Sequence, residues 1–345
     1  MKTIKPFAVV VTFLIIIILL VPALLVLPFS QEKASGRLEE DLQTENGAVN
    51  TVSTEAAIEV AVYRTNRQEL ETPQLEEYLI GVVASEMPAD FEKEALKAQA
   101  LTARTYIVKQ LENPNSAQLP NGAIVDDTEK YQVYKNRQEL EAQFRKKWGA
   151  DYQEKLSKVT EAVRETSGQI LTFENKPIEA TFFSTSNGYT ESSEAIWPNA
   201  IPYLTAVESP WDLKSPKFSG QKVISVDEFE EKLSVKLDNS GTIGKITEKT
   251  AGKRIAKVDI NGKTVTGKEI REKLKLKSTD FTWERKGNNI VINTKGFGHG
   301  VGMSQYGANG MAQEGKSYQD IVKYYYKGIE ITTIDKVLTK MAANQ

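Results

Sequence analysis

Residues 78–106 read YLIGVVASEMPADFEKEALKAQALTARTY, an apolar segment followed by a short break and an amphipathic segment. Pro88 has no amide hydrogen and disfavours helical angles in the residue before it, so the first helix should end near Glu86. We expect Asp90 to cap the second helix, because a carboxylate at a helix N-terminus accepts hydrogen bonds from unpaired amides. The stretch therefore predicts a carboxylate, Glu86, at a corner between two packed helices.

The second helix should bury one face against its neighbours. Its apolar residues recur at helical spacing, at Leu96, Ala100, Ala103 and Ile107. Most glutamates at helix ends are solvated or act as caps, so this pattern alone leaves Glu86 either structural or catalytic.

Composition narrows the classes of function. The 345 residues suffice for one large or two medium domains. A formal net charge of -2 gives no electrostatic reason to expect nucleic acid. The chain has no cysteine, which excludes disulfides, thiolate nucleophiles and thiolate metal sites, and His299 is its only histidine. The sequence therefore predicts no metal site and no cofactor.

The N-terminus predicts a membrane anchor. Residues 7–29 are almost uninterruptedly apolar, and about 22 residues at about 1.5 Å each span the hydrocarbon core. Lys2 and Lys5 precede this run, so residues 1–6 should stay in the cytoplasm and the rest of the chain should lie outside it. A cleaved signal peptide is the alternative, but no small-residue cleavage site follows the run. We predict a single-pass protein of the cell membrane.

The rest of the chain predicts an α+β fold of mixed helices and antiparallel hairpins. Residues 30–56 are polar and aperiodic, as in a flexible linker. We expect an extracytoplasmic catalytic domain over 57–335, with a smaller β-rich second lobe at 220–280 and a C-terminal tail at 336–345. Helices are predicted over 137–147, 153–166, 303–314 and 317–326, and another begins near Lys268. Hairpins are predicted over 169–183, around Asn261-Gly262 and over 281–293.

Two loops carry groups that could contact a ligand. A hydroxyl- and amide-rich run, Ser184-Thr185-Ser186-Asn187-Gly188-Tyr189-Thr190, follows a predicted strand, where ligand-binding groups are common but ordinary turns also occur. Residues 296–308 are rich in glycine, which permits positive backbone dihedrals and close approach of the main chain. This second loop is neither a dinucleotide fingerprint nor a Walker loop. His299 within it could line a site or satisfy the loop.

Three blocks together, 78–106, 183–203 and 296–308, resemble the stage II sporulation protein D family in order and spacing. The resemblance implies a membrane-anchored lytic transglycosylase that acts on peptidoglycan during forespore engulfment. It also implies a preference for glycan strands stripped of stem peptides, a partner amidase–endopeptidase and a membrane scaffold. The catalytic glutamate of the family motif corresponds to Glu86. Some relatives bind zinc through cysteine and histidine, and this chain lacks those cysteines.

The implied chemistry accounts for a single carboxyl group. A hydrolytic glycosidase usually needs two carboxylates, whereas a lytic transglycosylase can use one, because the muramoyl 6-hydroxyl replaces water and closes a 1,6-anhydro ring. Glu86 would first protonate the glycosidic oxygen and then accept the proton of the hydroxyl group. To act as an acid near neutral pH, Glu86 needs a raised pKa. Second acids could still approach Glu86 in space, namely Asp126, Asp127, Glu191 and Glu194.

We expect the sugar hydroxyls and acetamides to be bound by Arg104, Ser184, Ser186, Tyr203, His299, Gln305 and Tyr306. For Arg104, structural pairing with a carboxylate is an equal alternative. Two competing functions stay open. One is a non-catalytic glycan-binding module that enhances a cell-wall amidase, and the other is a conventional two-carboxylate hydrolase.

Overall fold

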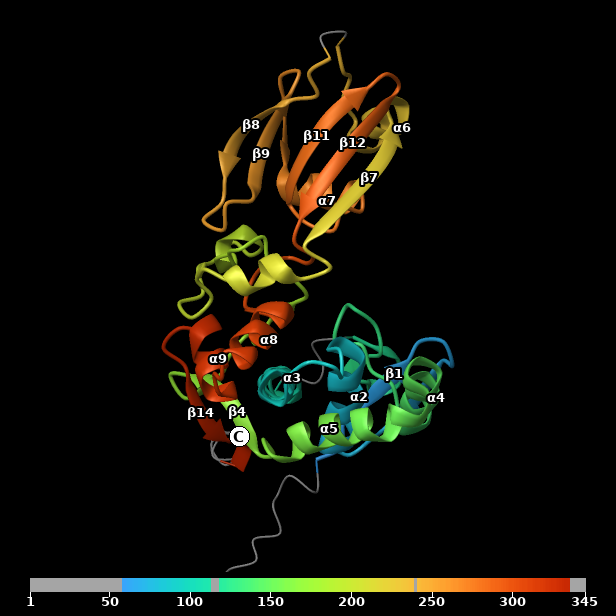
Figure 1. Cartoon of the computed structure of the whole chain (residues 1–345), viewed down its shortest axis with the longest axis vertical. Helices are drawn as coiled ribbons and strands as arrows, with labels where there is room; N and C mark the ends of the chain where they lie inside the picture. Colours follow the sequence, from blue (N-terminus) through green and yellow to red (C-terminus); the bar gives the residue numbers. More distant parts are fainter. Residues whose placement is uncertain (1–57, 113–117, 239–240, 336–345) are drawn as a thin grey trace, which may run out of the picture. The chain divides into compact units, whose positions relative to one another are not determined.

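The computed structural model describes residues 58–112, 118–238 and 241–335, all within one compact unit. The predicted anchor, the whole predicted linker and the C-terminal tail lie outside these residues. Across the described ranges, no helix combines the length and apolarity needed to cross a membrane. The described fold is α+β, with helices and several small sheets (Figure 1).

Two helices meet at Glu86. Helix α2, Leu75–Glu86, ends at this residue as predicted, because Met87 before Pro88 adopts extended angles (φ -118°, ψ 137°). Helix α3, Lys93–Glu112, begins later than expected, so the prediction that Asp90 caps it is wrong. A turn closed by the Phe91 amide on the Pro88 carbonyl comes first, and Asp90 instead pairs with Lys155 at 2.9 Å.

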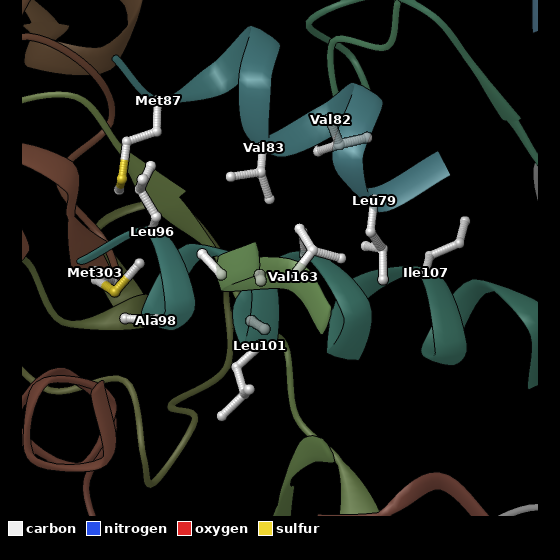
Figure 2. Close-up of a cluster of buried hydrophobic side chains, with 14 of the residues drawn as sticks. Leu79, Val82, Val83, Met87, Leu96, Ala98, Leu101, Ile107, Val163 and Met303 are labelled. Atoms are coloured by element: carbon white, nitrogen blue, oxygen red, sulfur yellow. The ribbon is translucent and has the colours of Figure 1, made fainter. Parts of the chain in front are cut away.

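Helix α3 lies in the middle of the larger hydrophobic core (Figure 1). All four residues of its predicted stripe are fully buried, and α3 contacts α2, α5 (Tyr152–Arg164), α8 (Gln305–Gln313) and α9 (Tyr318–Tyr325). Figure 2 shows Val83 of α2, Leu101 of α3 and Val163 of α5 in this cluster. Because α3 contacts neighbours on several sides, it is buried almost all round rather than along one stripe. Its many alanines are small enough to let these neighbours pack closely against it.

Short strands and two further helices surround this core. Strand β1 (Val62–Arg64) pairs antiparallel with β2 (Glu69–Glu71) and parallel with β3 (Val125–Asp126). Helix α4, Arg137–Trp148, starts with a capping box between Asn136 and Glu139, and α5 follows it. The helices predicted over 137–147 and 153–166 are confirmed within one or two residues.

The hairpin predicted over 169–183 is only half present. Strand β4 (Gln169–Phe173) pairs with the short β5 (Lys176–Pro177) across Glu174 and Asn175, which both have positive φ. The continuation is different, because β6 (Phe182–Phe183) pairs in parallel with β13 (Met303–Ser304) of the glycine-rich segment. The free edge of β4 is taken by β14 (Glu330–Thr333).

A second hydrophobic core, separate from the first, draws its buried residues from Ile224 to Ile292. It includes the sheet of β7 (Ser219–Ser225), β11 (Asp280–Lys286) and β12 (Asn289–Lys295), and the sheet of β8 (Lys245–Lys249), β9 (Ile255–Ile260) and β10 (Lys263–Thr266). Helices α6 (Val226–Leu233) and α7 (Gly267–Lys273) complete it (Figure 1). The hairpins at Asn261-Gly262 and over 281–293 are confirmed.

Candidate active site

Glu86 is a partly buried carboxyl group at the C-terminus of α2. Its Oε1 accepts a hydrogen bond of 2.7 Å from the Val133 amide. Burial raises the pKa of Glu86, the Val133 hydrogen bond opposes this, and the charge of Glu129 adds to it. Among the described residues Glu86 forms no salt bridge, and its Oε2 accepts no hydrogen bond. One oxygen is therefore held, and no described residue donates a hydrogen bond to the other.

The segment that supplies the Val133 amide is held against α2 about one to two turns before Glu86. The ring of Tyr134 stacks on Tyr78 with centroids 5.2 Å apart. A Cβ atom at Gly81 would lie 2.4 Å from the Lys135 carbonyl oxygen and 2.5 Å from the Tyr134 ring. Glycine at 81 therefore permits the close approach that brings the Val133 amide to the carboxyl group.

The glycine-rich segment reaches the same corner from the other end of the chain. Gln305, at the start of α8, donates from Nε2 to the backbone carbonyl of Glu86 at 3.1 Å. The last carbonyls of a helix have no partner within it, so this hydrogen bond satisfies one at the end of α2. The Tyr306 amide donates to the Ser184 carbonyl at 3.1 Å, and the Tyr306 ring meets Phe91 edge-on. Glu86, Ser184, Gln305 and Tyr306 are thus linked by contacts.

A buried carboxylate that the sequence did not indicate organises the base of this arrangement. Asp212 is fully buried and accepts hydrogen bonds from Ser186, Ser209 and Ser304 at 2.6–2.7 Å. Burial raises the pKa of Asp212, and the three hydroxyl donors oppose that rise. Ser304 also caps α8, so Asp212 fixes the helix start that carries Gln305. Only the dense hydroxyl run at 184–190 hinted that such an acceptor exists.

Besides Gln305, which is itself only 5% exposed, three more of the predicted binding residues lie in the interior. Arg104 is fully buried, pairs bidentately with Glu76 at 2.9 Å, and donates to carbonyls near the end of α5. Ser186 is occupied by Asp212 as described. The hydroxyl of Tyr203, which is 9% exposed, accepts from the Glu179 amide at 2.9 Å. For Arg104, this geometry favours the structural alternative.

His299 lies at a different place, a pocket of about 800 Å³ whose lining also includes Glu191, Trp197 and Arg271. Its Nδ1 accepts from the Val301 amide at 3.2 Å. Burial, with repulsion from Arg271, lowers the pKa of His299 to about 4, so the ring is neutral near pH 7. Glu86 does not line this pocket.

The acids considered as second carboxylates are occupied elsewhere. Asp126 accepts from Thr128, Asp127 pairs with Arg64, and Glu191 pairs with Arg254. Glu194 lines the His299 pocket. The acid whose charge acts on Glu86 is the exposed Glu129, which sequence analysis missed because no motif contains it.

Within the described ranges, no group of three or more His, Asp or Glu side chains is arranged so that it could hold a metal ion. The Val133 amide contacts the Glu86 carboxylate and Gln305 contacts the Glu86 backbone carbonyl, so two distant segments meet at this residue of an α+β protein with a single-glutamate candidate site.

Comparison with known proteins places this chain in a family. The model described as "Stage II sporulation protein" matches residues 46–173, which include α2, α3 and Glu86. The chain is 52% identical over 349 residues to Stage II sporulation protein D of Bacillus subtilis (strain 168), covering 99% of this chain and 100% of that protein. Identity and coverage are the same for Stage II sporulation protein D of Bacillus amyloliquefaciens. The chain belongs to the stage II sporulation protein D family.

A more distant relative carries a different description. The "Amidase enhancer" of Bacillus subtilis (strain 168) is 29% identical over 313 residues, which cover 74% of this chain and 40% of that protein.

Proposed function

We propose that this protein is a lytic transglycosylase that cleaves the bond between N-acetylmuramic acid and N-acetylglucosamine in peptidoglycan during sporulation. The observation that carries the proposal is the state of Glu86, a partly buried carboxyl group with a raised pKa and one oxygen that no described residue engages. A carboxyl group with a raised pKa keeps its proton to a higher pH than a solvated glutamate does, which suits a general acid.

The reaction would need no second protein carboxylate. Protonated Glu86 donates its proton to the glycosidic oxygen as the bond from that oxygen to the muramoyl C1 breaks. The muramoyl C6 hydroxyl oxygen bonds to C1, and its proton passes to the Glu86 carboxylate. The product is a 1,6-anhydro ring, no water is consumed, and Glu86 returns to its starting state. The Val133 amide supports this cycle because it holds Oε1 and stabilises the carboxylate form.

The deciding experiment uses the full-length protein in detergent, incubated with peptide-free glycan strands and followed by mass spectrometry. We expect fragments one water lighter than hydrolytic fragments, reduced at least about 100-fold in Glu86→Gln, since general acid–base catalysis contributes about 10²–10⁴-fold. Glu77→Gln, an exposed glutamate on the same helix, serves as the control. Fragments that incorporate solvent oxygen, together with lost activity in Glu129→Gln, would instead establish a two-carboxylate hydrolase.

One observation favours a second candidate function. The similarity to the amidase enhancer suggests a module that binds glycan and stimulates a partner amidase without cleaving. In that case strands would stay intact but bind the protein, and purified amidase would release stem peptides faster in its presence. Glu86→Gln would leave this stimulation unchanged.

We also propose the setting that the sequence predicts. The protein would be anchored in the cell membrane by residues 7–29, with its catalytic domain outside the cytoplasm. A cell-wall amidase–endopeptidase would supply stripped strands, and a membrane scaffold would hold the enzymes together. Protease protection of the catalytic domain in intact cells, lost on permeabilisation, would contradict the orientation.

A further inference from the structure

The ammonium groups of two exposed lysines lie near aromatic rings beside the candidate site. The Lys217 ammonium lies 5.7 Å from the centroid of the Phe297 ring and 5.9 Å from that of Tyr306. The Lys277 ammonium lies 5.4 Å from the Phe297 centroid. Neither ammonium forms a salt bridge within the described part of the chain. Two positive charges therefore share one partly exposed ring, and neither is in a salt bridge with a described residue.

Hydrogen bonds fix the backbone that carries these side chains. Phe297 and Thr185 exchange two backbone hydrogen bonds, of 2.7 and 3.0 Å. The Lys277 carbonyl accepts from the Gly298 amide at 2.9 Å, and the Lys217 amide donates to Ser215 Oγ at 3.1 Å. The segments of Thr185 and Lys277 are thus hydrogen-bonded to the segment that carries this ring, and a local hydrogen bond orients the backbone of Lys217.

This surface continues towards Glu86. Tyr306 directly follows Gln305, which donates to the Glu86 carbonyl. On its other side, the Tyr306 ring meets Phe91, with centroids 4.9 Å apart, and Phe91 lies in the turn after Glu86. Phe91, Tyr306 and Phe297 connect the catalytic corner to the two ammonium groups.

The chemistry of this surface suits an acidic sugar. Aromatic rings pack against the apolar faces of pyranose rings, and ammonium groups attract carboxylates. In peptidoglycan strands the muramoyl unit carries a lactyl group, which is a carboxylate when no peptide is attached and a neutral amide when a peptide is attached. We propose that Lys217, Lys277, Phe297 and Tyr306 form a subsite for the free lactyl carboxylate. This proposal rests on the proposed function, and it assigns discrimination against substituted strands to these side chains.

The test measures binding, so that it does not depend on cleavage. Full-length Glu86→Gln protein in detergent is titrated with peptide-free strands, and with the same strands after their lactyl carboxylates are amidated with methylamine. We expect amidation to weaken binding about 10-fold or more. Changing both lysines (Lys217→Gln with Lys277→Gln) should weaken binding to the carboxylate strands by a similar factor and abolish the discrimination. Lys245→Gln on β8, another exposed lysine, should change neither value.

The outcomes separate this proposal from the proposed function. Equal binding of both kinds of strand, full discrimination by the double lysine variant, or no binding of either strand would overturn the subsite. Cleavage by the wild-type protein is read separately by mass spectrometry. Discrimination without cleavage would overturn the transglycosylase and keep the subsite, whereas cleavage without discrimination would overturn the subsite alone.

Discussion

The buried Glu191 and the partly buried Glu86 differ in how many protein groups contact their carboxylates. Glu191 is 2% exposed and accepts hydrogen bonds from the Thr250 hydroxyl and the Gly252 amide, with Arg254 at 3.6 Å. Glu86 is more exposed, accepts one hydrogen bond, and forms no salt bridge within the described ranges. Burial raises the pKa of both carboxyl groups, so the direction of the shift does not distinguish them.

The number of donors does distinguish them. At Glu191, the Thr250 hydroxyl and the Gly252 amide donate hydrogen bonds to the carboxylate, and the fully buried guanidinium of Arg254 lies close to it. These contacts join residues 250–254 to the segment that carries Glu191. Both side-chain oxygens of Glu191 are therefore engaged by protein donors. At Glu86 one amide orients the group and the second oxygen faces no described partner. The comparison predicts that Glu191 acts on stability and Glu86 on activity.

The largest expected effect on stability comes from Glu191→Ala. Removing this carboxylate leaves the Arg254 guanidinium buried without its counter-charge, which should lower the free energy of unfolding by about 3–5 kcal/mol. Urea denaturation at pH 7 measures the change. Glu194→Ala, which alters an exposed neighbour, should stay within about 0.5 kcal/mol of wild type. If Glu191→Ala changed the free energy of unfolding as little as Glu194→Ala does, the pair of Glu191 and Arg254 would not stabilise the fold.

A smaller effect is expected from Gly81→Ala, which tests how Glu86 is oriented. The added methyl group would meet the Lys135 carbonyl and the Tyr134 ring, so overpacking should cost about 1–3 kcal/mol. It should also displace the Val133 amide and reduce glycan cleavage by more than the loss of folded protein explains. Denaturation and specific activity are compared with those of Glu77→Ala on the same helix. Unchanged activity would mean that the Val133 hydrogen bond does not matter to catalysis.

A pH-dependent effect is expected at His299, in the pocket that Glu191 also lines. Its folded-state pKa of about 4 lies below the ordinary value, so the unfolded chain takes up the proton first as pH falls. Its contribution to stability is complete above about pH 6.5 and is lost as pH falls towards 4. We expect the loss between pH 7 and pH 5 to be smaller in His299→Gln than in wild type by about 1–2 kcal/mol. Identical pH profiles in urea denaturation would contradict this assignment.

The smallest stability effect should come from Glu86→Gln. The folded-state pKa of Glu86 is raised, so its ionisation destabilises the fold as pH rises from the ordinary value through the raised one. Replacing it with the neutral amide removes this penalty, and the variant should match or slightly exceed wild-type stability at pH 7, by less than about 1 kcal/mol. A loss of several kcal/mol in denaturation would make Glu86 a structural residue like Glu191.

The helical corner at Glu86 is predictable from the sequence because the residues that form it are close together in the chain. Pro88 determines the angles of Met87, and therefore the end of α2, without help from any distant residue. The hairpin at Asn261-Gly262 is similarly local, since both residues must adopt positive φ there. Predictions that depended on a distant partner were less successful. Asp90 bonds to Lys155 instead of capping α3, and the segment after Pro177 leaves β4 to pair with the glycine-rich loop.

By itself the sequence determined where the helices end, which glutamate stands at their junction, and which family the chain resembles. Only the tertiary structure decided which polar groups line that junction. Arg104, Ser186 and Tyr203 carry the same functional groups as surface binding residues, yet Glu76, Asp212 and Glu179 occupy them in the interior. A buried polar group must find a partner, and that partner can come from anywhere in the chain, so residue type alone does not reveal whether a side chain serves the fold or a ligand.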